Sequence, residues 1–267
     1  MPELPDVEIF RRRLEAHARG RAISAVHILD KRLLDAVSAA RLSCILEDSR
    51  VVSTARHGKH LFVELDNGSL LVLHFGMTGE ILTLGRGAGT PRYTALRLAF
   101  NDGSGVAITS RRRLGHIALA KDASAFIRSH ELGPDALDPT LDIQAFQAAL
   151  GSPRSAIKSA LMDQSKLAGI GNIYSDEILF QAGLGPTVRV GDLNYEQRNR
   201  LFQTMRRVLK EAVERGVLSE GTTAALPGDW LLGHRAKGER CPHCGTAVQA
   251  SKVAGRSCYF CPSCQVD

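Results

Sequence analysis

The feature that most constrains the fold of this chain is a cluster of cysteines near its end. Two Cys-x2-Cys pairs are separated by the sixteen residues 245–260. The four cysteines are Cys241, Cys244, Cys261 and Cys264. This spacing is typical of a four-cysteine zinc ribbon, in which each pair supplies two thiolates from a tight turn. Because so short a unit has little hydrophobic core, we expect one structural Zn²⁺ to supply much of its folding free energy.

The residues between the two pairs suit a β-hairpin. We predict strands over 247–252 and 257–260, with residues 254–256 near the tip. Cys258 forms an alternative Cys-x2-Cys with Cys261, but the outer pairing leaves the more symmetric loop. Cys258 is therefore predicted to pack as a small apolar residue.

A basic charge balance favours a polyanionic partner. The chain has 34 Lys and Arg against 28 Asp and Glu, a formal net charge of +6, which nucleic-acid-binding proteins share with ribosomal and membrane-surface proteins. Arg256, beside Gly255 at the predicted hairpin tip, suits a phosphate contact, although a solvated charge would look the same. No apolar run is long enough to span a membrane, and the first residues lack the apolar stretch of a signal peptide. We therefore expect a cytoplasmic protein, associated with the nucleoid if bacterial.

The 267 residues are enough for two domains and a small module. Apolar residues at helical spacing predict a helix over 7–18, with Asp6 able to cap its start. From about 22 to 120, short β segments and hairpin turns at 66–68 and 101–103 favour a sandwich or barrel over alternating βαβ units. The clearest of these strands span 22–28, 59–65, 69–74, 95–100 and 117–120.

Residues 131–141 are rich in helix and strand breakers and are predicted to form an interdomain linker. The pattern after this linker is helical. The predicted helices cover about 142–150, 153–162, 172–182 and 194–215, with Ser152-Pro153 as an N-cap and first-turn pair. Residues 217–238 are Gly-rich and ambiguous. We therefore predict a β domain over 1–130, a helical domain over 142–238 and a zinc module over 239–267.

The opening residues carry a candidate nucleophile. Removal of Met1 would leave Pro2 with a free secondary amine, which is partly unprotonated at neutral pH because an α-amino group titrates near pH ~8. Glu3 places a carboxylate beside that amine. The alternative is that Pro2 is only a rigid start to the chain, and on these residues alone that interpretation is favoured.

A Gly-rich turn joins two of the predicted helices. Gly169 and Gly171 let the backbone bend and approach a ligand closely, and Asn172 can cap the helix that follows. Exposed N–H groups at that helix start would form a phosphate site. A tight connection between two helices, with no ligand, explains the same spacing equally well.

Two loops of the β domain combine apolar and basic residues. Residues 74–79, His-Phe-Gly-Met-Thr-Gly, place Met77 between Gly-containing turns, where its side chain can act as a wedge between stacked bases. Residues 110–115 place three arginines beside Leu114, which suits a filler for the space left by an extruded base. The alternative, until the loops are shown to converge, is ordinary solvated charges and a half-buried Met77.

Together these stretches resemble the formamidopyrimidine-DNA glycosylase/endonuclease VIII family of base-excision repair enzymes over nearly the whole chain. The resemblance rests on the opening Pro-Glu-Leu-Pro-Asp-Val-Glu, the two loops, Leu-Gly-Pro at 132–134, Asp-Gln-Ser-Lys-Leu-Ala-Gly-Ile-Gly-Asn-Ile-Tyr at 163–174, and the zinc ribbon with Ala-Gly-Arg. The chain is more similar to the formamidopyrimidine branch. The resemblance implies an α+β fold, with an N-terminal β-sandwich flanked by helices, a helix–two-turn–helix domain and a zinc finger, and with DNA in the cleft between.

The resemblance also implies a mechanism on damaged double-stranded DNA. After the damaged base is flipped out, Pro2 attacks C1′ of its nucleoside, an iminium forms and the base leaves. β-Elimination and then δ-elimination cut the strand. Glu3 would act as general acid/base at the sugar ring.

The resemblance assigns further roles residue by residue. It implies that Lys59, Asn172 and Arg256 grip phosphates, and that Lys59 and Arg256 join Pro2 and Glu3 in the catalytic set. Lys158 and Tyr174 match weaker supporting positions. Met77, Arg112 and Leu114 match positions that fill the gap left by the base, and His74, the first residue of the Met77 loop, is a further DNA-binding candidate. The four cysteines match the zinc ligands.

Three stretches depart from the family pattern. Asp6 stands where Glu is usual, so its reach is shorter. Leu114 replaces the Phe of an Asp-Pro-Arg-Arg-Phe-Gly pattern, which affects the choice of opposite base. Residues 217–238 are shorter than the stretch that closes over 8-oxoguanine in typical formamidopyrimidine glycosylases. We therefore expect weak 8-oxoguanine activity and favour formamidopyrimidines, oxidised pyrimidines or abasic sites as substrates.

The expected function is thus a monomeric bifunctional DNA glycosylase/AP lyase. The alternative is a non-catalytic protein that binds damaged DNA, against which the intact Pro2-Glu3 pair and Lys59 argue. A zinc-ribbon adaptor, such as a transcription factor, would explain the cysteine module but would leave the N-terminus unexplained.

Overall fold

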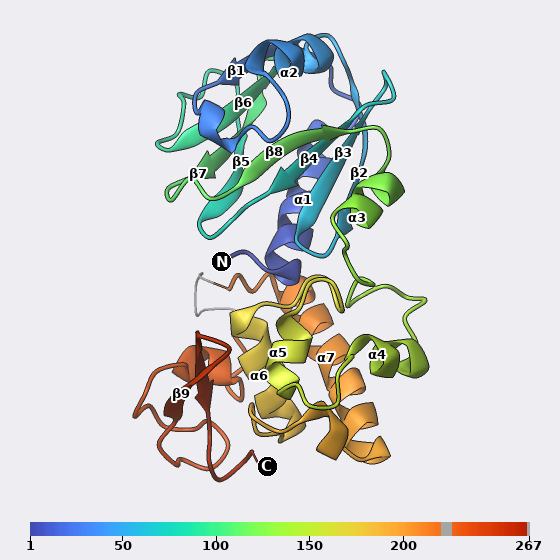
Figure 1. Ribbon diagram of the computed structural model, residues 1–267. Coiled ribbons are helices and arrows are strands. Elements are labelled where there is room, and N and C mark those ends of the chain that lie inside the picture. Colours follow the sequence, from blue (N-terminus) through green and yellow to red (C-terminus); the bar gives the residue numbers. More distant parts are fainter. Residues whose placement is uncertain (220–225, 266–267) are drawn as a thin grey trace. The chain divides into compact units, whose positions relative to one another are not determined.

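The computed structural model describes residues 1–219 and 226–265 (Figure 1). It divides into two compact units. The first comprises Met1–Pro2 and Asp6–His130, and the second comprises Glu3–Pro5 and Glu131–Asp267. The predicted α+β class, with a β-sandwich, a helical domain and a cysteine hairpin, is confirmed.

Two antiparallel four-stranded sheets form the first unit (Figure 1). One sheet has the order β1 (Ile23–Ile28), β6 (Thr94–Phe100), β7 (Gly105–Ser110) and β5 (Gly79–Leu84). The other has the order β2 (Val51–His57), β3 (His60–Leu65), β4 (Leu70–His74) and β8 (His116–Ala120). Buried side chains of both sheets, such as Leu73 and Ile81, line one common core, so the unit is a sandwich. The turns predicted at 66–68 and 101–103 connect β3 to β4 and β6 to β7, with Gly68 and Gly103 at positive φ.

Helices accompany the sandwich, and the three after the first lie where the sequence pattern predicted none. The first unit contains most of α1 (Leu4–Ala18), together with η1 (Lys31–Leu33), α2 (Ala39–Leu46) and α3 (Ala123–Ser129). In α2, Ser38 caps the start by accepting from Arg41 N at 3.2 Å, and Leu42 and Leu46 are buried one turn apart. Eight residues with two buried leucines are too short a signal to separate from a strand by periodicity.

The first helix begins three residues earlier than predicted, at Leu4. Pro5 suits a first turn, because its missing N–H would have no helical partner there. Asp6 therefore lies inside the first turn and is not the N-cap, and its side chain is buried. The prediction that Asp6 caps the helix is wrong.

Four helices and several short segments are found among the described residues of the second unit. The helices are α4 (Ile143–Ala149), α5 (Ile157–Met162), α6 (Asn172–Ala182) and α7 (Tyr195–Arg215), and the 3₁₀ turns are η2 (Val190–Asp192) and η4 (Leu231–His234). α7 has a capping box, in which the Asn194 side chain accepts from Gln197 N while Gln197 bonds back to Asn194 N. α6 is buried along almost its whole length, and its Tyr174 and Ile178 belong to one core with Trp230.

α5 begins four residues later than predicted, so Ser152-Pro153 does not start it. The carbonyls of Pro153 and Ser155 accept instead from Gly191 N and Val190 N, at 2.8 and 2.9 Å. Residues 153–155 form a turn and a bend, and these tertiary hydrogen bonds, which the local sequence does not reveal, delay the helix until Ile157.

The cysteine module is a hairpin of β9 (Gln249–Val253) and β10 (Arg256–Phe260). Ala254 and Gly255 form a two-residue turn with φ of 49° and 76°. The predicted strands were shifted by one or two residues. Within the Gly-rich stretch 217–238, residues 220–225 lie outside the described residues, so its predicted role in lesion choice stays a prediction.

Candidate active site and metal centre

Glu3 is fixed by the start of α6. Its Oε2 accepts from Gly171 N at 2.6 Å and Tyr174 N at 3.2 Å, and its Oε1 accepts from Ile173 N at 2.8 Å. The residue is fully buried. The carboxylate thus satisfies three N–H groups that a helix start leaves without intrahelical partners, and the helix dipole favours its negative charge.

Two glycines make room for this arrangement. A Cβ added to Gly171 would lie 2.4 Å from Glu3 Cδ, and one added to Gly169 would lie 2.6 Å from a Leu4 methyl carbon. Leu4 N also donates to Gly169 O at 3.0 Å. The close approach predicted for the Gly-rich turn is therefore real, but its partner is the N-terminal segment of the same chain. The predicted phosphate site on these N–H groups is replaced by the Glu3 carboxylate, and Gly171, not Asn172, is the N-cap of α6.

A buried charge cluster lies directly behind this helix start. Lys158 of α5 is fully buried and forms a very short ion pair with Asp176 of α6. The Lys158 ammonium also donates to Asn172 O at 3.2 Å. Tyr174 is fully buried as well, and its hydroxyl donates to Val217 O at 3.1 Å. Both side chains are therefore buried in this structure, and Lys158 supports Asn172 through its backbone carbonyl.

Asp176 also connects α6 to the cysteine hairpin. Its Oδ2 accepts from Arg235 Nε at 2.8 Å and from the backbone N–H of Tyr259 at 3.3 Å. The Arg235 guanidinium lies 4.9 Å from the centroid of the Tyr259 ring. One carboxylate therefore serves donors from α5, from the residue after η4 and from β10.

Sequence reasoning missed Asp176, Arg235 and Glu177. Asp176 and Glu177 are acidic residues inside a helix whose other central residues are apolar, and that mismatch was the available signal. Burial raises the pKa of Glu177 to about 8, although its carboxylate accepts from Leu232 N at 2.7 Å and from the Gln181 amide at 3.0 Å.

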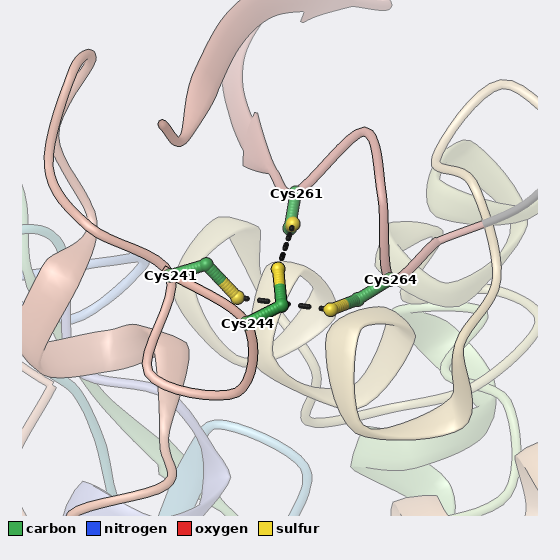
Figure 2. Close-up of side chains that lie close together, drawn as sticks. All are labelled: Cys241, Cys244, Cys261 and Cys264. Atoms are coloured by element: carbon green, nitrogen blue, oxygen red, sulfur yellow. Dashed lines mark hydrogen bonds between the residues drawn. The ribbon is translucent and has the colours of Figure 1, made fainter. Parts of the chain in front are cut away.

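The four predicted cysteine ligands converge (Figure 2). Their sulfurs all lie within 4.8 Å of one another, with Cys241 to Cys264 at 3.8 Å and Cys244 to Cys261 at 3.6 Å. Four Zn–S bonds of about 2.3 Å in a tetrahedron imply an S–S separation of about 3.8 Å. The cluster therefore fits one structural Zn²⁺, and this prediction is confirmed.

Cys258 is separate from the zinc cluster and fully buried. Burial raises the pKa of its thiol to about 12, and the nearby Asp176 carboxylate adds to the effect. Cys258 is therefore an inert packed thiol, as predicted. Arg256 is the first residue of β10, and it is exposed beside the hairpin turn.

In the first unit the two predicted loops do converge. A Cβ added to Gly76 would lie 2.3 Å from Leu114 O, so the Met77 loop packs against the backbone of the Arg-rich loop. Thr78 Oγ1 accepts from Arg112 N at 3.0 Å, which joins the loops a second time. Leu114 is 46% exposed at the end of its loop, and the Arg112 side chain is exposed.

Arg112 and Arg113 of the second loop differ in what they contact. Arg113 forms an ion pair of 3.1 Å with Asp30, and it adopts a φ of 55°. The Arg32 guanidinium, and to a lesser degree that of Arg113, lowers the pKa of Asp30. Arg113 is thus a structural residue of this loop, whereas Arg112 projects from it.

Lys59 and His74 lie at the ends of neighbouring strands. Lys59 is buried in the turn from β2 to β3, and it is 7% exposed. Burial lowers the pKa of His74 to about 4, and the nearby charges of His116 and Lys59 act in the same direction. His74 Nδ1 accepts from Gly76 N at 3.3 Å, which ties this side chain to the Met77 loop.

Comparison with known proteins agrees with this arrangement. Three family models match in sequence: the formamidopyrimidine-DNA glycosylase N-terminal domain over residues 1–117, its H2TH domain over 132–223, and a zinc finger found in FPG and IleRS over 238–266. A formamidopyrimidine-DNA glycosylase of Thermomicrobium roseum is 38% identical, with 99% of each chain covered. The chain belongs to the formamidopyrimidine-DNA glycosylase family. Membership identifies it as a DNA glycosylase with a zinc finger.

Other family members are similar over the full length. The formamidopyrimidine-DNA glycosylase of Halorhodospira halophila is 34% identical, covering 99% of this chain and 100% of its own. Among solved structures, a mutant Lactococcus lactis FPG bound to DNA containing Fapy-dG matches with a TM-score of 0.89, 28% identity and full coverage of both chains. Lactococcus lactis Fpg bound to DNA with an abasic site matches with a TM-score of 0.88 and 26% identity, covering 99% of this chain and 100% of that one. No helix among the described residues of this family member is long and apolar enough to cross a bilayer.

Proposed function

We propose that this chain is a bifunctional glycosylase and AP lyase that uses Pro2 as its nucleophile. After removal of Met1, the Pro2 nitrogen would form a bond to C1′ of the flipped nucleotide, and the bond from C1′ to the damaged base would break. The C1′–O4′ bond of the sugar then breaks to give the iminium, which accepts electrons when the C2′ proton leaves and the 3′ phosphate departs. Loss of a second proton, from C4′, then expels the 5′ phosphate. A secondary amine suits this chemistry because it forms the iminium directly.

The fixed position of Glu3 is the observation that carries this proposal. Three backbone N–H groups hold its carboxylate, and the residue before it is the proposed nucleophile. These bonds fix the carboxylate next to Pro2 in the sequence, which suits a group that transfers protons at the sugar. A Pro2 that served only as a rigid start would not require so firmly held a neighbour.

Residues of both units are proposed to bind the DNA. Lys59, Asn172 and Arg256 would contact phosphates, with His74 as a further contact, while Lys158 and Tyr174 hold the Asn172 region from behind. The joined loops carrying Met77, Arg112 and Leu114 would fill the space left by the extruded base. The contacts between these loops support that role, because a filler needs several side chains at one place.

We propose formamidopyrimidines and abasic sites as the preferred substrates, followed by oxidised pyrimidines, with weak activity on 8-oxoguanine. The complexes of the Lactococcus lactis relatives with Fapy-dG and with an abasic site support the first two. The short stretch 217–238 is the reason to expect little 8-oxoguanine excision. A side-by-side panel of duplexes with these lesions would rank them.

Borohydride trapping tests the chemistry. The protein should form a covalent adduct with an abasic duplex, and Pro2→Gly should weaken or abolish that adduct while leaving duplex binding in place. Intact mass spectrometry should show a chain without Met1. Tight binding of abasic DNA with neither adduct nor strand scission would identify the alternative, a non-catalytic damage-binding protein.

A further inference from the structure

A row of histidines crosses one sheet of the first unit. His60 in β3 pairs directly with His74 in β4, and His74 pairs with His116 in β8. Directly opposed side chains lie on the same face of a sheet, so these imidazoles form a ladder. The ring centroids of His60 and His74 are 4.9 Å apart, and those of His74 and His116 are 5.8 Å apart.

The end of α3 adds a fourth histidine to this face. His130 stacks on Phe126 with a centroid separation of 3.8 Å, and its ring lies 6.3 Å from that of His60. The four imidazoles and Asp35 line a cavity of about 150 Å³. A water molecule occupies about 30 Å³ in the liquid, so this space is large enough for an ion with bound water.

Hydrogen bonds determine which ring nitrogens are available. His130 Nδ1 lies 2.9 Å from the carbonyl oxygen of Phe126, and a carbonyl can only accept, so Nδ1 carries the proton and Nε2 keeps its lone pair. Metal-binding histidines have this arrangement. His74 has the opposite one, because its Nδ1 accepts from Gly76 N and the neutral ring then carries its proton on Nε2. His74 is therefore left out of the ligand set.

His60 supplies an unsatisfied nitrogen. Among the residues that the structure describes, its buried Nδ1 has no hydrogen-bond partner. Leaving such a group unpaired costs about 1–3 kcal/mol. Burial also lowers the pKa of His60 to about 3, so the ring is neutral at pH 7. Neutral imidazole is the form that binds metals, whereas an anion would require charged rings.

We propose that His60, His116, His130 and Asp35 form a second metal site, which takes one divalent transition-metal ion such as Ni²⁺, Co²⁺ or Zn²⁺. Imidazoles with one carboxylate are a ligand set that these ions accept. Within the described ranges only the four cysteines already hold their ligand atoms within 4.8 Å of one another, so the imidazoles must turn to meet the ion. His116 and His130 are exposed and can change rotamer, and the site is accordingly weaker than the cysteine cluster.

The ion would fasten α3 to the sheet. No residue of α3 is fully buried, and an element with so little burial opens readily. His60 and His116 belong to the sheet, whereas His130 ends α3. An ion shared by the three would therefore protect the helix from local opening.

Equilibrium dialysis of the zinc-loaded full chain against Ni²⁺ tests the site. We expect one Ni²⁺ beyond the zinc, with a Kd of about 1–100 µM, and a loss of about tenfold or more in affinity for His116→Ala and for His130→Ala. His27→Ala is the matched control, since His27 is an exposed histidine of β1 that does not line the cavity. Extra Ni²⁺ that is undetectable, or that survives the double variant His116→Ala/His130→Ala, would overturn the proposal.

Two further measurements test where the ion binds and whether it holds α3 to the sheet. Co²⁺ bound at the second site should show a d–d band without thiolate-to-cobalt charge transfer, and a charge-transfer band would place the ion at the cysteines instead. Ni²⁺ should slow amide exchange over residues 123–130 in the unmodified chain and in His27→Ala but not in His130→Ala. Equal exchange with and without Ni²⁺ in all three would refute the link to α3.

Discussion

The carboxylate of Glu3 accepts a hydrogen bond of 2.6 Å from the backbone N–H of Gly171, a residue 168 positions further along the chain. α6 has no side-chain cap of its own. Glu3 takes the place of that cap, and the start of a helix thereby holds the residue next to the proposed nucleophile. The same contact therefore caps the helix and fixes the position of a proposed catalytic residue.

Replacing Glu3 by Gln should lower the stability of the fold and the proposed glycosylase activity. Wherever the new NH₂ group lies, it faces a backbone N–H that previously had an acceptor, so one or two hydrogen bonds are lost inside a buried site. We expect the free energy of unfolding to fall by about 1–3 kcal/mol, measured by urea denaturation. Glu47→Gln is the control, because Glu47 is exposed. An unchanged free energy of unfolding in Glu3→Gln would show that the capping contact does not stabilise the fold.

Arg256→Ala should weaken binding to every lesion duplex alike. A phosphate contact carries no information about the base, so lesion preference should stay the same, and the slope of log K against log salt should become shallower by about one. Fluorescence polarisation over a salt series measures both. Lys252→Ala is a matched control on the same hairpin, since Lys252 is an exposed cation on β9. A shift in lesion preference without loss of affinity would contradict the phosphate role.

Zinc removal should unfold the hairpin and abolish DNA binding. Because so small a module has little core, chelation should bring amide exchange over residues 238–265 to the rate of an unfolded chain. Two cysteine variants sharpen the test: Cys261→Ala should release zinc, whereas Cys258→Ala should retain it, since Cys258 is packed outside the cluster. Full DNA binding by the metal-free protein would refute the structural role of zinc.

Glu177 should make stability depend on pH. Burial raises its folded pKa from 4.5 to about 8, so between these values the folded state holds a proton that the unfolded state has released. The sign follows: stability is lost as the pH rises through this window, by at most about 1.4 kcal/mol per pH unit. Chemical denaturation of the wild type and of Glu177→Gln at several pH values should show this slope only in the wild type. Parallel curves would mean that the folded carboxyl titrates normally.

The zinc hairpin and the sandwich could be predicted because their signals are local. Cysteine spacing and hairpin turns such as 66–68 act within a few residues, and both were placed to within one or two positions. The start of α5 could not be predicted in this way, since the carbonyls of Pro153 and Ser155 are bonded to distant partners at Gly191 and Val190. Propensity at Ser152-Pro153 was outweighed by tertiary hydrogen bonds.

The site residues divide along the same line. The roles given to Glu3, Met77 and Leu114 from residue type and family resemblance stay predictions, and the structure adds the hydrogen bonds that hold Glu3. Lys158 and Tyr174 were singled out only because they match supporting positions of the family. Their complete burial depends on Asp176 and on the Val217 carbonyl, which lie 18 and 43 positions away and which no local pattern connects to them.

The shared acceptor at Asp176 restricts how this protein can diverge. Lys158, Arg235 and the β10 backbone all depend on one carboxylate, so a change at position 176 alone leaves a buried ammonium without its counter-charge. Substitutions at 158, 176 and 235 should therefore be inherited as a set. In lineages that lose the zinc ligands and with them the hairpin, Arg235 should lose its selective constraint, whereas Lys158 and Asp176 should be released only together, when apolar residues replace both partners of the ion pair.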